Sequence, residues 1–290
     1  MIFRTSSTRL ARLLVVLGGL LATLPTSRLF AQGGEDDPLD FRGITQRVGL
    51  EVGFTSVWQS GTYTTGCGLF GKGAGANFLI AAAYDRKLGG SPFQFEALLG
   101  YQSRNVLGSY ISNETIGIST ESGPVDARVS FDNIGEANFS YVFLQPSLKF
   151  YPFDALYGGV GVGVNVLLSA STQYSKNILS KTIQLNELGL SEVSYSENES
   201  SDPYSKVFPA ESRNDAAAVT FDGIITVGAE FTVARTTADV TTPLSTASQK
   251  KLVVGPRLQY VIPFVNALSD GENAMRLNGL QFLVGFRYGF

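Results

Sequence analysis

The chain has no histidine and only one cysteine, Cys67, in 290 residues. Without histidine it cannot carry a Ser-His-Asp triad, a Cys-His pair or a histidine-rich zinc site, although carboxylate-only chemistry stays open. A single cysteine also cannot form a disulfide within the chain. We therefore expect a protein that is not an enzyme, with no catalytic residue, no cofactor and no metal site.

Long apolar runs are missing from most of the chain. After the first 31 residues no run approaches 18 residues, which excludes a helical membrane protein. Near the start, three arginines precede a short apolar run at Leu13–Leu24, and Ala31 offers a small residue for cleavage. This is the layout of a secretory signal peptide, and the run is shorter than the roughly 20 residues that a membrane helix needs. The sequence predicts a signal peptide at 1–31 and a periplasmic segment at 32–45.

Basic residues are few. The whole chain has a net charge of −3, and removing the predicted signal with its four arginines would leave 18 basic and 25 acidic residues, a net charge of −7. A nucleic-acid partner would require a basic surface, so none is expected.

After residue 45 the recurring pattern is alternation of apolar and polar residues, which is the period of a strand with two different faces. In the first such segment the apolar face carries Val48, Leu50, Val52 and Phe54. Each segment is long enough to cross a bilayer as a tilted strand of about 9–11 residues. The eight segments are 47–58, 76–85, 92–102, 138–151, 156–171, 221–233, 251–264 and 279–290.

Alternating strands suit either a soluble sandwich or barrel, with apolar residues inside, or a transmembrane barrel, with apolar residues outside. The polar faces are rich in Gly, Gln and Ser with single charges, which suits a crowded barrel interior. Short and long connections also alternate, although the link at 234–249 is longer than this pattern predicts. Several aromatic residues, Tyr63 and Tyr157 among them, stand near strand ends, as in an interfacial girdle. We predict an eight-stranded antiparallel transmembrane β-barrel over 46–290, with ten strands as the alternative if a long loop contributes a hairpin.

Six charged residues fall on the polar faces of these strands. Because an eight-stranded barrel has room only for side chains, we expect the charges to pair inside it. A structural network that fills the lumen is favoured over a narrow pore in which charge rings select ions. The predicted lumen network is Glu51, Glu96, Lys149, Glu230, Arg257 and Arg287.

Gly66–Lys72 reads G-x-x-x-x-G-K, most of a phosphate-binding loop. Gly73 replaces the required Ser or Thr, and no helical pattern follows, so a flexible glycine-rich loop is the interpretation. Two longer polar segments, 105–136 and 173–217, are also predicted to be loops, functional or disordered. The acidic stretch 191–202 is expected to be mobile. A protein partner would bind at these loops if anywhere.

The segment "YVFLQPSLKFYPFDALYGGVGVGVNVLLSAS", with Pro146 in mid-strand and a glycine-rich strand after it, resembles the centre of PorT-like outer-membrane barrels, a group of small OmpA-like barrels. The segments "FDGIITVGAEF" and "KLVVGPRLQYVIPF" resemble the strand pair that follows, and the likeness covers 46–290. The terminal "FRYGF" resembles the signal by which such barrels are recognised for insertion, which implies roles for Phe286, Tyr288 and Phe290.

The resemblance implies a protein of the outer membrane of a Gram-negative bacterium, in contact with lipid and with the barrel-assembly machinery. The leading hypothesis is a structural or interaction role, in which the barrel anchors surface loops or docks envelope components, with a surface or periplasmic protein as partner. The alternative is a narrow porin-like channel for ions or small solutes. An outer-membrane lipid hydrolase or protease is a third class, disfavoured because such enzymes rely on histidine.

Overall fold

The computed structural model describes most of the chain from residue 46 onward. The predicted signal peptide, the segment 32–45, Cys67 and Phe290 lie outside the described residues. The described ranges are 46–66, 68–88, 91–120, 123–153, 155–185, 189–195, 202–237, 249–270 and 273–289.

Within these ranges every regular element is a strand. None of the described residues belongs to a helix that is long and apolar enough to cross a membrane.

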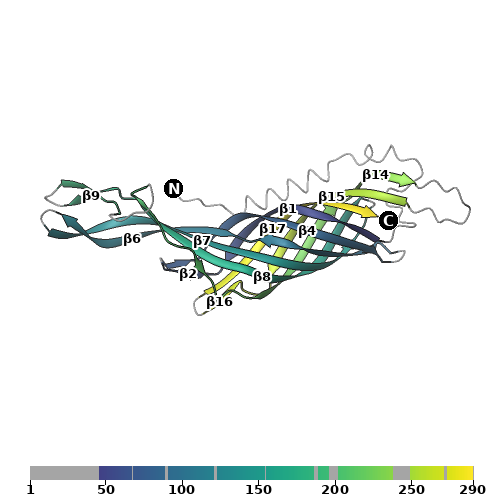
Figure 1. Cartoon of the computed structure of the whole chain (residues 1–290), viewed down its shortest axis with the longest axis horizontal. Coiled ribbons are helices and arrows are strands. Elements are labelled where there is room, and N and C mark those ends of the chain that lie inside the picture. Colours follow the sequence, from purple (N-terminus) through teal and green to yellow (C-terminus); the bar gives the residue numbers. More distant parts are fainter. Residues whose placement is uncertain are drawn as a thin grey trace, which may run out of the picture. The chain divides into compact units, whose positions relative to one another are not determined.

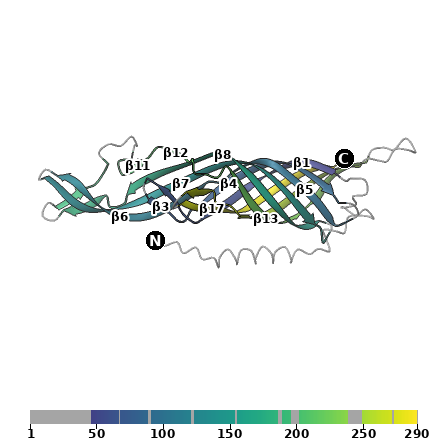
Figure 2. The ribbon, with the colours of Figure 1, turned by 90° about the horizontal axis from the view of Figure 1, so that it is seen from below.

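Eight strands form a closed ring of antiparallel hydrogen-bonded pairs. The ring closes where the first strand pairs with the last, from Arg47 opposite Gly289 to Ser60 opposite Arg276. Figures 1 and 2 show the strands running obliquely around the barrel. In ring order they are β1 (Gln46–Ser60), β4 (Ala74–Lys87), β5 (Phe93–Ser103), β7 (Gly123–Phe150), β8 (Leu156–Ile178), β13 (Val219–Ala229), β15 (Gln249–Pro263) and β17 (Asn273–Gly289).

The structure confirms the predicted eight-stranded antiparallel barrel. Each predicted segment overlaps one ring strand, because alternation with period two is what a strand with one lipid face and one lumen face requires. On β1, Leu50 and Phe54 are exposed on the outside, whereas Glu51 and Thr55 are buried inside. Short connections join β4 to β5 and β7 to β8 at one end, which we call the short-turn end.

At the other end, the long-loop end, strands replace much of the predicted loop structure. Residues 105–136 do not form an open loop: β6 (Val106–Thr120) pairs with β7 along its whole length, and β8 continues to Ile178 beside β7. The reason is a second alternation in β7, where Val125, Ala127, Val129 and Phe131 face the same side. This hairpin prolongs β5 and β7 and does not join the ring, so the ten-stranded alternative is wrong.

The prolonged strands form what we call the protruding lobe: the β6–β7 hairpin, the end of β8, and the β9–β10 hairpin (Figure 1). It has an apolar core of its own, to which Val193 and Tyr195 of the predicted mobile stretch contribute. Its buried residues are Ala127, Val129, Phe131, Ile178, Ile183 and Val193. The remaining short strands at the long-loop end are β2 (Tyr63–Thr65), β3 (Gly68–Phe70), β9 (Thr182–Leu185), β10 (Gly189–Glu192), β11 (Ser205–Val207), β12 (Glu211–Ser212) and β16 (Leu268–Asp270).

The unexpectedly long link after the sixth ring strand is partly strand. β14 (Phe231–Thr237) continues β13 and pairs with β15, ending with Thr237 opposite Gln249. A register shift between Thr232 and Ala234 marks a bulge in this extension. Because β14 and β15 pair, the connection between them that is left unpaired is 238–248, which lies outside the described residues.

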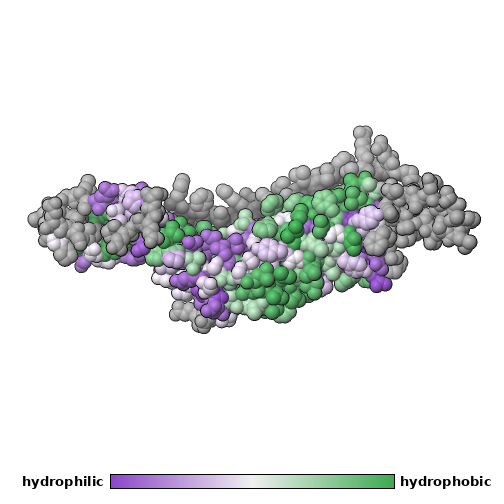
Figure 3. Space-filling view, viewed as in Figure 1, coloured by the Kyte–Doolittle hydropathy of each residue, from purple (hydrophilic) through white to green (hydrophobic). Residues whose placement is uncertain are grey.

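The outer face of the ring is apolar. Exposed apolar side chains occur on every ring strand, including Phe54 on β1, Leu144 on β7, Val160 on β8 and Phe282 on β17. Figure 3 shows hydrophobic residues gathered over the barrel and hydrophilic ones towards its long-loop end. An outward apolar band around a closed barrel spans a membrane, because every backbone group within the ladder is paired and only apolar side chains meet lipid.

Candidate functional site: the closed lumen

The lumen is filled in three layers, which follow one another along β1 from the short-turn end. Arg47 and Glu51 lie in a layer of charges, Thr55 in a layer of amides and hydroxyls, and Val57 in an apolar cluster at the long-loop end. The order follows from the strand itself, since alternate residues of β1 point inward at successive heights.

The charge layer contains all six residues predicted from the sequence, each no more than 6% exposed. Two further residues belong to it, Arg47 and Asp85, which the sequence interpretation missed. Both stand on inward-facing positions: Arg47 is two residues before Gly49, and Asp85 follows Leu79, Ala81 and Ala83 on alternate positions. The charge layer is thus Arg47, Glu51, Asp85, Glu96, Lys149, Glu230, Arg257 and Arg287, with four charges of each sign.

Glu96 contacts three of the four cations of the charge layer. Its Oε2 lies 2.6 Å from Lys149 Nζ and 3.0 Å from an Arg287 terminal nitrogen, and Oε1 accepts a hydrogen bond from Arg257. Arg257 also pairs with Glu51. A terminal nitrogen of Arg287 lies 3.0 Å from Oε2 of Glu51. These contacts join β1, β5, β7, β15 and β17 across the lumen.

A second carboxylate cluster closes the rest of the charge layer. Arg47 pairs with Glu230 at 2.6 Å and with Asp85 at 3.1 Å. Lys149 reaches Glu230 at 3.2 Å, and Arg287 reaches Asp85 at 3.1 Å. Because four cations balance four anions, the layer has no net charge, which is the arrangement in which buried charges are tolerated.

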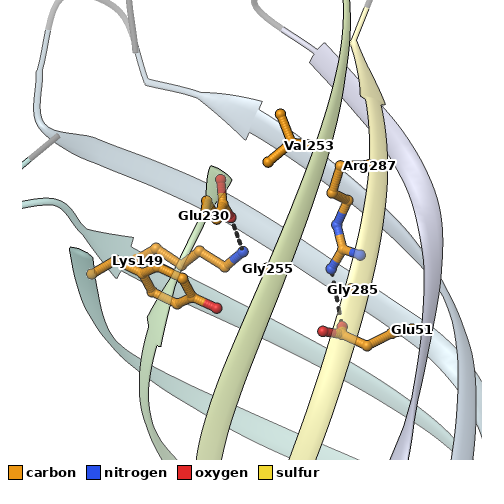
Figure 4. A pocket seen from close by; sticks show the side chains of 8 residues that line it. Glu51, Lys149, Glu230, Val253, Gly255, Gly285 and Arg287 are labelled. Atoms are coloured by element: carbon orange, nitrogen blue, oxygen red, sulfur yellow. Dashed lines mark hydrogen bonds and ion pairs between the residues drawn. The ribbon is translucent and has the colours of Figure 1, made fainter. Parts of the chain in front are cut away.

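Little space remains between these side chains. Figure 4 shows the cavity beside Lys149, Glu230, Glu51 and Arg287, where Gly255 and Gly285 leave room along the wall. Its volume is about 10 Å³. That is the scale of one water molecule, so this cavity has no room for a hydrated ion.

The middle layer consists mainly of amides and hydroxyls and includes one ion pair. Gln102 Nε2 donates to Asn165 Oδ1 at 2.7 Å, and Gln259 Nε2 donates to Thr226 Oγ1 at 3.1 Å. Asn165 also donates to Asp222, whose carboxylate pairs with Arg104 at 2.5 Å. Arg104 and Asp222 form one more balanced pair that the sequence interpretation did not identify.

The long-loop end of the lumen is closed by an apolar cluster, which we call the mouth cluster. The β2–β3 hairpin turns into the barrel and buries Tyr63 and Phe70, whose rings stack at 5.2 Å. The remaining buried members are Val57, Val106, Ala137, Phe139, Tyr141, Ala267, Leu268, Met275 and Leu277.

The mouth cluster corrects two interpretations. Gly66–Lys72 does not form a flexible loop in its described part: Gly68–Phe70 is strand β3, and Phe70 is anchored in the cluster. Nor does Tyr63 belong to an interfacial girdle, because its ring is buried in the mouth. Tyr157 also turns inward, with Lys149 Nζ 4.7 Å above its ring.

The β2–β3 hairpin is held by polar contacts from two segments, the one that follows β12 and the start of β17. Arg213 donates to the Thr64 carbonyl oxygen at 2.9 Å, and Asn273 accepts from the Thr64 N–H at 2.7 Å. Asp215 binds Arg213 through both carboxylate oxygens, at 2.7 and 2.5 Å, and accepts from Asn273 at 3.3 Å. We call Arg213, Asp215 and Asn273 the hairpin latch.

Of the three residues of the predicted insertion signal, two are described. Phe286 and Tyr288 are exposed on the outer face of β17, 47% and 40% respectively. Among the described residues there is also no group of three or more His, Cys, Asp or Glu side chains placed to hold a metal ion.

No family model and no curated protein matches this chain. Solved structures similar to it include Ail, the attachment invasion locus protein of Yersinia pestis, with 11% identity, 84% of this chain and 99% of that chain covered, and a TM-score of 0.31. Neisserial surface protein A follows with 8% identity, 84% and 97% coverage, and a TM-score of 0.30. A mutant of the monoaromatic hydrocarbon channel TodX has 10% identity, 88% and 93% coverage, and a TM-score of 0.20. Because these scores are low, we infer nothing about this chain from the likeness.

The geometry of the chain itself assigns its surroundings. A single-chain barrel with an even number of antiparallel strands, an apolar outer band and a polar interior is the construction of bacterial outer membranes. The chain is a β-barrel of the outer membrane of a Gram-negative cell, and its outer face contacts lipid.

Proposed function

We propose that this outer-membrane barrel is a closed anchor, with a structural or interaction role and no catalytic one, that presents the protruding lobe outside the cell. The observation that carries the proposal is that the lumen is closed twice, by the charge layer and by the mouth cluster. The two closures use different chemistry and different segments. A path for ions would require both to open.

The interaction part of the proposal rests on the protruding lobe. A barrel that only filled the membrane would need strands of about 9–11 residues, yet β7 has 28 residues and β8 has 23. The additional length builds a lobe with its own buried apolar core. A folded surface of this kind can hold a partner protein more firmly than a mobile loop, because less conformational entropy is lost on binding.

The proposal extends to family and export. We propose that the chain is a PorT-like barrel, exported by a signal peptide at 1–31. The barrel-assembly machinery would recognise the terminal Phe286, Tyr288 and Phe290. The outward exposure of Phe286 and Tyr288 supports this, since a recognition element must be accessible before the barrel enters lipid.

The test is single-channel recording of the refolded full-length protein in a planar lipid bilayer, with folding shown separately by circular dichroism. We expect no stable conductance steps. Stable steps would contradict the closed anchor and favour the narrow porin-like channel. Glu96→Gln and Arg257→Gln would then be compared, because a change in ion selectivity would place the path through the charge layer.

A further inference from the structure

One long edge of the protruding lobe is open. β6 pairs with β7 on one side from Val106 to Thr120. On its other side, the described residues provide only one partner, Ala74 opposite Leu107. From Ile111 to Thr120 the outer edge therefore has no strand beside it among the described residues. In an antiparallel pair, alternate residues direct their N–H and C=O groups away from the partner, so this edge presents a row of hydrogen-bonding groups.

This edge lacks three of the features that protect natural edges against strand addition, which are proline, lysine and a bulge. The segment 111–120 contains no proline and no basic residue, and its register with β7 is unbroken. The edge strand β14 provides a contrast within the same chain, because it has a bulge between Thr232 and Ala234 and carries Arg235.

The side chains beside the open edge indicate what could pair with it. Ile111 is 67% exposed on the outer side of the hairpin. Leu107, earlier on the same face of β6, is 53% exposed. Between Val106 and Ala137 the sequence has five acidic residues and one basic residue. The acidic residue on the edge segment, Glu114, is already held by Lys176 at 2.6 Å. An added strand would meet an apolar position at Ile111 and a hairpin of net negative charge, whose one basic residue, Arg128, lies opposite Thr115.

We propose that the open edge of β6, from Ile111 to Thr120, binds an extended basic segment of a partner protein by antiparallel strand addition. Backbone hydrogen bonds supply the affinity in this mode of recognition, and alternate side chains supply the selectivity. A second copy of the chain fits less well, because it would bring two acidic hairpins together. The inference deepens the interaction role proposed above and rests on it.

The probe is a synthetic ten-residue peptide of alternating threonine and valine with three lysines. Binding to the full-length protein in lipid nanodiscs is followed by fluorescence anisotropy. Amide hydrogen exchange then locates the bound peptide. We expect the lysine peptide to bind and to slow exchange in β6. A peptide with glutamate in place of lysine should bind more weakly. A lysine peptide that is N-methylated on alternate residues should not bind, because it lacks the backbone N–H groups that would donate hydrogen bonds to β6.

Two variants test the position. Thr115→Lys adds a positive charge at an exposed site on the edge, and Val207→Lys adds the same charge on β11, at an exposed site beside β8. Because like charges on neighbouring strands repel, Thr115→Lys should weaken binding of the lysine peptide about threefold to tenfold. Val207→Lys should leave it unchanged.

Three results would overturn the inference: no binding of the lysine peptide, equal binding of the N-methylated peptide, or protection outside β6. Protection of β6 that grows with protein concentration in the absence of peptide would instead assign the edge to a second copy. The conductance test is independent of these results. Conducting barrels with a protected β6 would refute the closed anchor alone, whereas silent barrels without protection would refute strand addition alone.

Discussion

At the scale of the residue, the charge layer is stable only as a complete set. Taking charges out of water costs several kcal/mol per ion, and the opposite charges recover that energy only when all are paired. Glu96 is fully buried and contacts Lys149, Arg257 and Arg287, so three cations depend on one carboxylate.

Glu96→Gln keeps the shape of the side chain but leaves one net positive charge in the lumen. We expect a loss of about 3–5 kcal/mol in the free energy of unfolding, the usual cost of removing one partner from a buried pair. The measurement is urea unfolding of the refolded protein in vesicles. The matched control is Glu114→Gln in the partly exposed Glu114–Lys176 pair, where the loss should stay within about 1 kcal/mol. Equal losses in the two variants would show that the lumen is hydrated.

At the scale of the element, the β2–β3 hairpin depends on the hairpin latch. The hydrogen bonds from Arg213 hold the pKa of the Asp215 carboxyl below its usual value. A lowered pKa means that ionised Asp215 stabilises the latch above the unfolded value of about 3.9, and that this contribution is lost as pH falls through the lowered folded value.

The protection of amides in the β2–β3 hairpin, measured relative to their intrinsic exchange rate at each pH, should therefore fall on acidification below about pH 4, while protection in the ring strands stays high. Asp215→Asn should show lowered protection of the hairpin already at pH 7, and that protection should no longer depend on this titration. Glu211→Gln, an exposed change on the neighbouring β12, serves as the control and should behave like the natural protein. If Asp215→Asn left the protection of the β2–β3 hairpin amides unchanged, the proposed role of the latch would be excluded.

At the scale of the whole molecule, the proposed orientation can be measured on cells. In a Cys67→Ser background, Ile111→Cys lies on the protruding lobe and Ser91→Cys lies at the short-turn end. A membrane-impermeant maleimide should label Ile111→Cys on intact cells and Ser91→Cys only after the outer membrane is permeabilised. The reverse labelling pattern would show that the barrel has the opposite orientation and that the lobe does not lie at the cell surface.

The sequence was sufficient for what alternation alone determines. The ring strands and the inward direction of Glu51 or Arg257 follow from period two. Arg47 and Asp85 were within reach by the same rule, because both stand on inward-facing positions at strand ends. The mouth cluster could not be predicted in this way, because no local pattern makes Tyr63 and Phe70 turn into the barrel. Their burial depends on Leu268 and Met275, about 200 residues later in the chain. The protruding lobe was missed because its strands carry polar residues on one face outside the membrane.

The closing seam between β1 and β17 has a consequence for how the barrel is made. Glu51 and Arg287 are 236 positions apart, and they meet only when β1 and β17 pair and the ring closes. A barrel that still lacks β17 holds four carboxylates and three cations in its charge layer, and β1 and β15 each lack a neighbour. Such distant contacts form slowly, because the ordering of the whole chain precedes them. Arrival of Arg287 completes both the backbone ladder and the charge balance, so a half-assembled barrel carries an electrostatic defect that only the finished ring removes.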